Sequence, residues 1–183
     1  MTVTQRDARQ RGFTLAEVLV TLAIIAIMAA VLLPALNSQL AKGDTGRLAA
    51  DLVNIQTGSQ AFVSDIRRYP SGFPELTTAL TASSTDINAV AIPATSLPKW
   101  KGPYVTRDVG NTAGGVISPT FTSSAGGNGV NFLTVTVTGV SATDFANVEA
   151  ILDEGVAGGS STSGAIRYNA GSSTLTFLAL PIQ

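Results

Sequence analysis

One apolar segment limits what this chain can fold into. From Phe13 to Leu36, 24 consecutive residues suit a hydrocarbon environment, apart from the carboxylate of Glu17 and the hydroxyls of Thr14 and Thr21. A helix needs about 20 apolar residues to cross a bilayer, so this segment can span one. A threonine can bond back to its own helix, but a carboxylate deep in a membrane helix costs about 2.5 to 3.5 kcal/mol. Glu17 is therefore a candidate functional residue.

The residues on either side give this segment a direction. Residues 1–12 are polar and basic, with Arg6, Arg9 and Arg11 against a single acid, Asp7. A basic flank stays in the cytoplasm under the positive-inside rule, so we expect the bulk of the chain on the other side of the membrane.

The helical pattern continues beyond the apolar run, but on one face only. Apolar residues fall mostly three, four and seven residues apart, as in an amphipathic helix: Leu40, Leu48, Leu52, Ile55 and Phe62. We expect one helix from Phe13 to about Asp65. Its weakest stretch lies between residues 30 and 46, because Pro34 removes a backbone hydrogen bond and Gly43 and Gly46 lower helix propensity. A kink or a meltable stretch is expected there.

Composition excludes several kinds of chemistry. The chain has no cysteine and no histidine, so it cannot carry a Ser-His-Asp triad, a Cys-His dyad or a His- or Cys-ligated zinc site. Eleven basic residues against twelve acidic ones leave a formal net charge of −1, without a basic run, so a nucleic-acid partner is not expected. Most acids are scattered singly, and we expect no enzymatic activity.

The rest of the chain predicts a small sheet. Pro70, Gly72 and Pro74 end the helix, and a loop-rich connector follows to about residue 107. Residues 110–130 are rich in Gly, Ser, Thr and Asn and predict a surface loop, with a possible short strand at 116–121. The stretch "NFLTVTVTGV" alternates as a half-buried strand does. A capped helix from Ser141 and a C-terminal hairpin complete an α+β unit, a long helix on a mainly antiparallel sheet.

Two simple explanations of the apolar segment remain open at this point. A plain transmembrane anchor fits the hydropathy, but it leaves Glu17 unexplained. An ordinary secretory signal would be cut near Ala29 or Ala30, which would need an apolar core longer than the usual 7 to 15 residues. Such a cut would also discard the helix just where its amphipathic half begins.

The segment "RGFTLAEVLVTLAIIAIMAAVLLPAL" resembles the class III signal and N-terminal helix of type IV pilins and type II secretion pseudopilins. The match places Gly12 last in the leader, Phe13 at the new N-terminus and Glu17 as the fifth mature residue. Pro34 falls where the family often has a helix-breaking proline. The sequence "RRYP" after the long helix resembles a corner found in major-pseudopilin-like proteins. The chain lacks the cysteine pair that closes the C-terminal loop of many pilins. It also lacks a clear "DPWGNPY" segment, which is typical of the major pseudopilin.

The resemblance implies a processing and assembly route. A prepilin peptidase would cut between Gly12 and Phe13 and methylate the amine of Phe13, and Glu17 would neutralise that amine between subunits. The implied parts are a leader (1–12), a membrane or filament-core helix (13–36) and an extracytoplasmic domain (37–183). The implied partners are other copies, other pilin-like subunits, an inner-membrane assembly platform and the lipid bilayer. The filament would be periplasmic or on the cell surface; pilus and secretion pseudopilus, and major and minor subunit, stay open.

Two further sites are weaker candidates. The rings of Trp100 and Tyr104 in "LPKWKGPYV" predict packing over a sheet edge or helix, and stacking on a sugar is the alternative, which would suit a membrane-tethered tip or adhesin module. Asp153 and Glu154 beside a glycine-rich stretch are weak calcium candidates, because family members sometimes bind calcium near their C-terminal loop. They lack the alternating oxygen ligands of a full calcium loop, and no other cofactor is expected.

Overall fold

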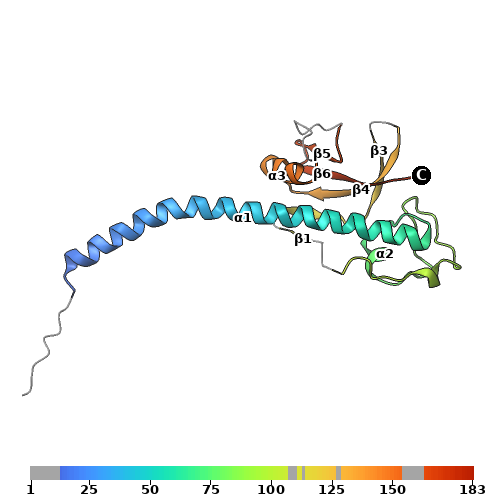
Figure 1. Ribbon diagram of the computed structural model, residues 1–183, viewed down its shortest axis with the longest axis horizontal. Coiled ribbons are helices and arrows are strands. Elements are labelled where there is room, and N and C mark those ends of the chain that lie inside the picture. Colours follow the sequence, from blue (N-terminus) through green and yellow to red (C-terminus); the bar gives the residue numbers. More distant parts are fainter. Residues whose placement is uncertain (1–12, 107–110, 113, 127–128, 154–162) are drawn as a thin grey trace, which may run out of the picture. The chain divides into compact units, whose positions relative to one another are not determined.

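The computed structural model describes residues 13–106, 111–112, 114–126, 129–153 and 163–183. The chain divides into two compact units, residues 1–40 and residues 41–183. Helix α1 (Leu15–Ile66) runs through both units (Figure 1). Gly12, Glu154 and the rest of the predicted leader lie outside the described residues.

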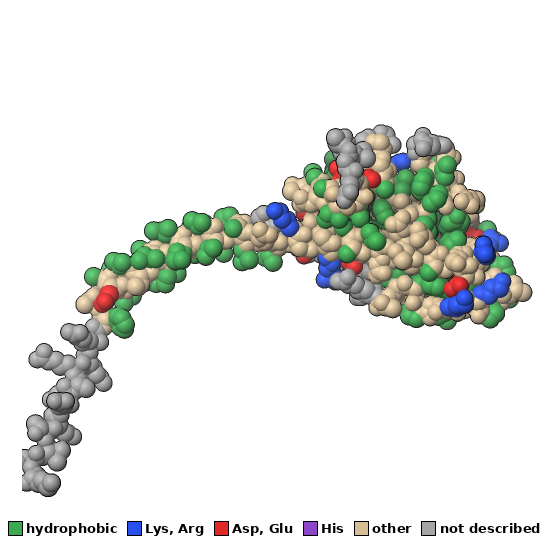
Figure 2. Space-filling model, in the orientation of Figure 1, with side chains coloured by type: hydrophobic (Ala, Val, Ile, Leu, Met, Phe, Trp, Pro, Cys, Tyr) green, Lys and Arg blue, Asp and Glu red, His purple; other side chains and the backbone are tan. Residues whose placement is uncertain are grey.

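In the first unit, α1 exposes its apolar side chains all round. The part from Leu15 to Leu36 has a mean hydropathy of 2.8 and no buried residue, so it is long and apolar enough to cross a membrane. Hydrophobic side chains cover this part of the helix in Figure 2. Large residues such as Leu15 and Val31 are 78% and 70% exposed. This surface requires lipid or other polypeptide to cover it, because isolated apolar patches of this size are rare on monomers.

The helix is continuous through its predicted weak stretch. Pro34 lies inside α1, and residues 30 to 46 are helical throughout. The boundary between the two units, after Leu40, falls within the same stretch. A kink or melting at Pro34 therefore stays a prediction.

In the second unit, the amphipathic half of α1 supplies one side of the core. Leu48, Leu52, Ile55 and Phe62 are fully buried, as the sequence predicted. Leu40, the last residue of the first unit, was expected on the same apolar stripe but is 59% exposed. These side chains share one hydrophobic cluster with the sheet, whose members include Leu133, Val135, Val137, Leu175 and Phe177. The amide of Gln56 donates to the carbonyl of Ala179 at 2.8 Å, which fixes the helix to the sheet.

Among the described residues, the sheet has five strand pairings, and all are antiparallel. Its order is β1 (Asn111–Thr112), β2 (Gly115–Ile117), β4 (Asn131–Thr138), β6 (Thr174–Pro181) and β5 (Ile166–Asn169). β3 (Thr122–Ala125) pairs with the other end of β4, on the same side as β2. The predicted hairpin is confirmed, since Ile166 faces Phe177 and Asn169 faces Thr174. The fold is α+β and pilin-like, as expected.

Helix α3 (Ala142–Leu152) starts where the sequence predicts. Ser141 is its N-cap, and the Ser141 hydroxyl oxygen accepts a hydrogen bond from the amide of Asp144 at 3.1 Å. Phe145 and Val148 are buried under the helix. The Phe145 ring stacks on Tyr168 of β5 with ring centroids 4.8 Å apart, so α3 is held against the end of the hairpin.

The connector from residue 67 to residue 106 is mostly irregular. It contains the short helix α2 (Phe73–Thr77) and the 3₁₀ turn η1 (Leu97–Lys99). An isolated bridge joins Gly72 to Thr120, and the Phe73 ring packs edge-on against Phe121 at 5.3 Å. The connector is therefore tied to the loop before β3.

Besides Leu40, the sequence interpretation differs from the structure in two places. Residues 110–130 were expected to be a loop with one possible strand at 116–121, and the described part of this region carries β1, β2 and β3 instead. The alternation in "NFLTVTVTGV" predicts that Thr134 lies on the solvent-exposed face of its strand, but Thr134 is 1% exposed. Its hydroxyl donates to the Thr122 carbonyl at 2.8 Å, so pairing with β3 satisfies and covers it.

Candidate functional site

The start of α1 is the first candidate site, and it forms a capping box. The amide of Glu17 donates to the Thr14 hydroxyl oxygen at 3.2 Å, and the Glu17 carboxylate accepts a longer contact from the Thr14 amide at 3.4 Å. Each residue thus satisfies a backbone donor that the helix leaves free. Glu17 is exposed, as are all the described residues of this segment.

Thr14 is a functional candidate that the sequence interpretation missed. The signal was present in the sequence, because "TLAE" is the S/T-x-x-E pattern of a capping box. The contact keeps the Glu17 carboxylate at the first turn of the helix, close to the backbone amide of the residue that follows Phe13. Thr21, in contrast, donates its hydroxyl to the carbonyl of Val18 at 2.9 Å, which satisfies it within the helix.

The Trp100 and Tyr104 pair is a packing cluster. The Trp100 ring nitrogen donates to the carbonyl of Glu75 at 2.9 Å, and the two rings meet edge-on with centroids 5.7 Å apart. Tyr104 also meets Phe62 of α1 edge-on at 5.7 Å. The rings therefore fasten the connector to α1, and this arrangement supports the packing interpretation over stacking on a sugar.

Polar contacts beside these rings also join the connector to α1. Asp65 near the end of α1 accepts hydrogen bonds from Lys101 at 3.0 Å and from the Tyr104 hydroxyl at 2.9 Å. The bonds from Lys101 and Tyr104 lower the pKa of Asp65, because they favour its ionised form. Burial raises the pKa of Tyr104, because it penalises the phenolate. The cluster is built to keep Asp65 charged and Tyr104 neutral.

The calcium candidate finds little support in the described residues. Asp153 is the C-cap of α3, and its carboxylate accepts a hydrogen bond from the amide of Ile166 at 3.1 Å. Glu154 lies outside the described residues. Within the part of the chain that is described, no three His, Cys, Asp or Glu side chains gather, whereas calcium takes six to eight oxygen ligands. A calcium site stays a prediction.

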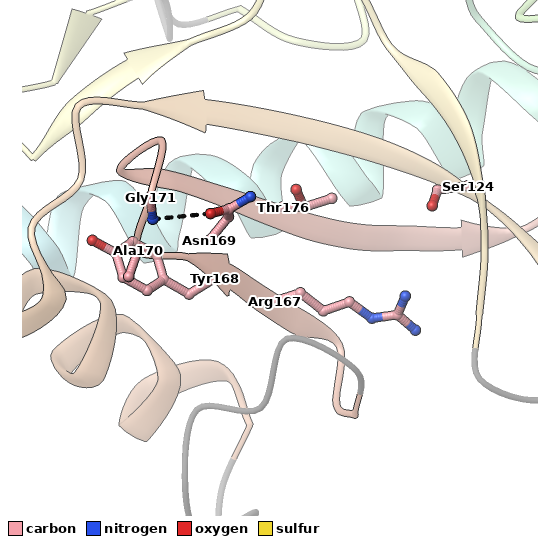
Figure 3. Close-up of a pocket in the computed structure, with 7 residues that line it drawn as sticks. All are labelled: Ser124, Arg167, Tyr168, Asn169, Ala170, Gly171 and Thr176. Atoms are coloured by element: carbon pink, nitrogen blue, oxygen red, sulfur yellow. Dashed lines mark hydrogen bonds between the residues drawn. The ribbon is translucent and has the colours of Figure 1, made fainter.

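A cavity on the outer face of the sheet is a further candidate site that sequence reasoning missed. It has a volume of about 610 Å³ and is lined by Ser124 of β3, Arg167, Tyr168 and Asn169 of β5, the turn residues Ala170 and Gly171, and Thr176 of β6 (Figure 3). Sequence periodicity does not predict this cavity, because its lining comes from strands that are about 40 residues apart in the sequence. Its lining is mainly polar.

Comparison with known proteins supports the interpretation of the N-terminal segment. Residues 7–33 match the family described as "Prokaryotic N-terminal methylation motif". The type II secretion system core protein G of Klebsiella michiganensis is 30% identical over 105 residues, which cover 54% of this chain and 74% of that protein. The chain belongs to the type IV pilin and pseudopilin family. Within that family, the relatives it matches bear the name type II secretion system core protein G.

Other relatives match over a shorter part. The core protein G of Pectobacterium carotovorum subsp. carotovorum is 34% identical over 67 residues, which cover 37% of this chain. The chain spans 43% of the length of that relative and 66% of the length of the Klebsiella pneumoniae protein. No solved structure matches the chain significantly.

Proposed function

We propose that this protein is a structural subunit of a type IV-like filament that is assembled from the inner membrane and serves type II protein secretion. The match of residues 7–33 to the methylation motif carries the proposal. Similarity to proteins named type II secretion system core protein G favours a secretion pseudopilus over a surface pilus. The packing of Trp100 and Tyr104 within the domain does not favour a tip or adhesin module.

The apolar half of α1 would pass from one apolar environment to another during assembly. Before assembly, the segment from Leu15 to Leu36 lies in the inner membrane, where lipid covers its exposed apolar side chains. In a filament, the same surfaces of neighbouring copies cover one another. Contact between apolar surfaces has little register of its own, because the hydrophobic effect is non-directional. Some polar group must therefore set the axial position of each subunit.

Glu17 is the group that we assign to this task. A buried carboxylate is tolerable only when it is paired and hydrogen-bonded. Cleavage by a prepilin peptidase between Gly12 and Phe13 would create an amine one residue before the Thr14 amide that Glu17 contacts. In a membrane or filament core, the amine of an incoming subunit and the Glu17 carboxylate of a neighbour would each satisfy the other. Methylation of the Phe13 amine would keep its positive charge.

The capping box allows the charge of Glu17 to be tested apart from its structural role. Glutamine serves the same position in a capping box, so Glu17→Gln keeps the cap and removes only the charge. We expect this variant to be cleaved and inserted normally but to give at least tenfold less filament in sheared or cross-linked envelope fractions. Glu17→Ala, which removes both cap and charge, should be at least as defective.

The matched control is Glu149→Gln, which neutralises a partly exposed carboxylate on α3. It should assemble like the unaltered protein. A normal yield of filament from Glu17→Gln would remove the carboxylate charge from the assembly mechanism.

A further inference from the structure

The cavity around Arg167 has no part in the proposed assembly function. It lies wholly within residues 41–183 and does not involve the apolar part of α1. Arg167 of β5 faces Thr176 of β6 in the strand pairing, so both side chains lie on the same face of the sheet. Figure 3 shows Arg167 extending along the cavity from β5 toward the side where Ser124 lies. The side-chain nitrogen Nη1 donates to the carbonyl of Ala125 in β3 at 3.0 Å.

The walls of the cavity are held in place by contacts outside it. The Tyr168 hydroxyl donates to the carbonyl of Val140 at 2.9 Å, and the Tyr168 ring stacks on Phe145. The side-chain oxygen of Asn169 accepts from the amide of Gly171 at 3.0 Å, which fixes the orientation of the Asn169 amide (Figure 3). The cavity is therefore preorganised, so a ligand would not have to order these side chains on binding.

Several donors in the cavity are left without a partner among the described residues. The Nε atom of Arg167 is buried and has no hydrogen-bond partner there, so a ligand would meet the guanidinium at its Nη atoms rather than at Nε. Because the Asn169 oxygen is taken by Gly171, its NH₂ group faces the opposite direction, toward Thr176 (Figure 3). Arg167 also makes no ion pair within the described part of the chain, whose ion pairs involve Arg47, Arg68 and Lys101. One positive charge and several neutral donors thus converge on a space without a carboxylate in its described lining.

The chemistry of these donors identifies the ligand. The planar guanidinium presents a fork of N–H donors that matches the two oxygens of a carboxylate. A phosphate group carries nearly two negative charges near neutral pH, whereas this cavity supplies one positive charge. Small-molecule sites are usually lined mainly by apolar and aromatic side chains, and this lining is mainly polar. A side chain presented by another polypeptide suits an open polar cavity better.

We propose that the Arg167 cavity binds the carboxylate of an acidic side chain on a peptide segment of a partner protein. Arg167 contributes the charge and the N–H donors of its Nη atoms. Asn169 and Thr176 contribute donors that favour a carboxylate over a carboxamide. The backbone of Ala125 holds the guanidinium in position.

The test uses the full chain in neutral detergent micelles, labelled with ¹⁵N for NMR. The probes are the peptide acetyl-Gly-Ser-Glu-Ser-Gly-amide, the same peptide with Gln in place of Glu, and sodium acetate. We expect the Glu peptide to shift the backbone amide signals of Gly171 and Thr176, and the Nε–H signal of Arg167, in a saturable way. The Gln peptide and acetate should bind at least tenfold more weakly.

Three variants separate the proposed contacts. Arg167→Gln should weaken binding of the Glu peptide at least tenfold. Asn169→Asp keeps the oxygen that Gly171 needs but places a carboxylate beside Arg167, so it should abolish binding. Arg67→Gln, which alters an exposed arginine outside the cavity, should bind like the unaltered protein.

Several outcomes would overturn the proposal. Equal affinity for the Glu and Gln peptides would show that charge is not recognised, and unchanged affinity in Arg167→Gln would show that Arg167 is not the receptor. Acetate that saturates the signals at the same concentration as the peptide would make this a small-anion site. If Arg167→Gln loses the dispersed amide signals of the folded chain, Asn169→Asp decides the question, and normal binding by that variant would contradict the proposal.

Discussion

Two kinds of residue anchor the amphipathic half of α1 to its domain, buried apolar side chains and one partly exposed polar cluster. Phe62 represents the first kind, since it is fully buried and meets Tyr104 edge-on. Asp65 represents the second, since it accepts hydrogen bonds from both Lys101 and Tyr104. The two kinds of contact are tested by different changes. The contribution of a buried ring to stability depends on its volume, whereas that of the polar cluster depends on the ionisation of Asp65 and Tyr104.

Truncation of Phe62 should destabilise the globular unit strongly. Phe62→Ala removes a fully buried ring from the contact between α1 and the connector, and such changes cost about 3 to 5 kcal/mol. The fluorescence of Trp100, the one tryptophan of the chain, can follow urea unfolding of the detergent-solubilised protein. Val53→Ala, on the exposed side of the same helix, should change stability by no more than about 0.5 kcal/mol. Similar midpoints for the two variants would contradict the assigned core.

The Asp65 cluster should give stability a pH dependence at both ends of the scale. Because the pKa of Asp65 is lowered on folding, its contribution is present above the unfolded value of about 3.9 and is lost as pH falls below it. Because the pKa of Tyr104 is raised, its neutral form is favoured, and stability falls as pH rises above about 10. Asp65→Asn should flatten the acid limb of a plot of melting temperature against pH. An unchanged acid limb would show that Asp65 does not contribute to it.

Among the elements, α1 carries two kinds of glycine with opposite expected behaviour. An added Cβ at Gly43 or Gly46 would meet nothing within 4 Å. An added Cβ at Gly58 would lie 2.6 Å from Val105 and 3.0 Å from the Tyr104 carbonyl, so Gly58 lets the connector approach the helix closely. The first two glycines weaken the helix without any packing reason, whereas the third is required by packing.

This difference predicts opposite effects of alanine. Gly43→Ala and Gly46→Ala should each stabilise the helix by about 0.5 to 1 kcal/mol, because alanine loses less conformational freedom than glycine. Gly58→Ala should destabilise the domain despite the same gain in helix propensity, and urea unfolding measures both. If the stretch around Pro34 must loosen during assembly, the stabilised Gly43→Ala and Gly46→Ala chains should also assemble more slowly. Stabilisation of the domain by Gly58→Ala would contradict the close approach of the connector to α1 at Gly58.

The elements with a periodic or capping signal could be predicted from the sequence. The buried stripe from Leu48 to Phe62, the cap at Ser141 and the closing hairpin are all local patterns, and the structure confirms them. β3 could not be predicted, because its residues are all exposed and show no alternation, and it exists only through pairing with β4. The Arg167 cavity was missed for the same reason, since strand pairing creates it.

At the scale of the whole molecule, the N-terminal motif and the domain fold support the same family assignment. The motif of residues 7–33 and the domain fold together place the chain among pilins and pseudopilins. The cost of a membrane carboxylate singled out Glu17 from the sequence, and its role in assembly stays a proposal. The capping box with Thr14 was legible as "TLAE" but was recognised only in the structure. The contact explains how one carboxylate can serve the isolated helix and, as we propose, a neighbouring subunit in turn.

The central claim is that this helix becomes functional only when its leader is removed at Gly12. Intact-mass and N-terminal fragment spectrometry of the chain purified from membranes tests this claim most directly. The account predicts a mature chain that begins with N-methylated Phe13, and a Gly12→Leu variant that keeps residues 1–12. A mature chain that begins near Val31, or Gly12→Leu chains that still begin at Phe13, would contradict it.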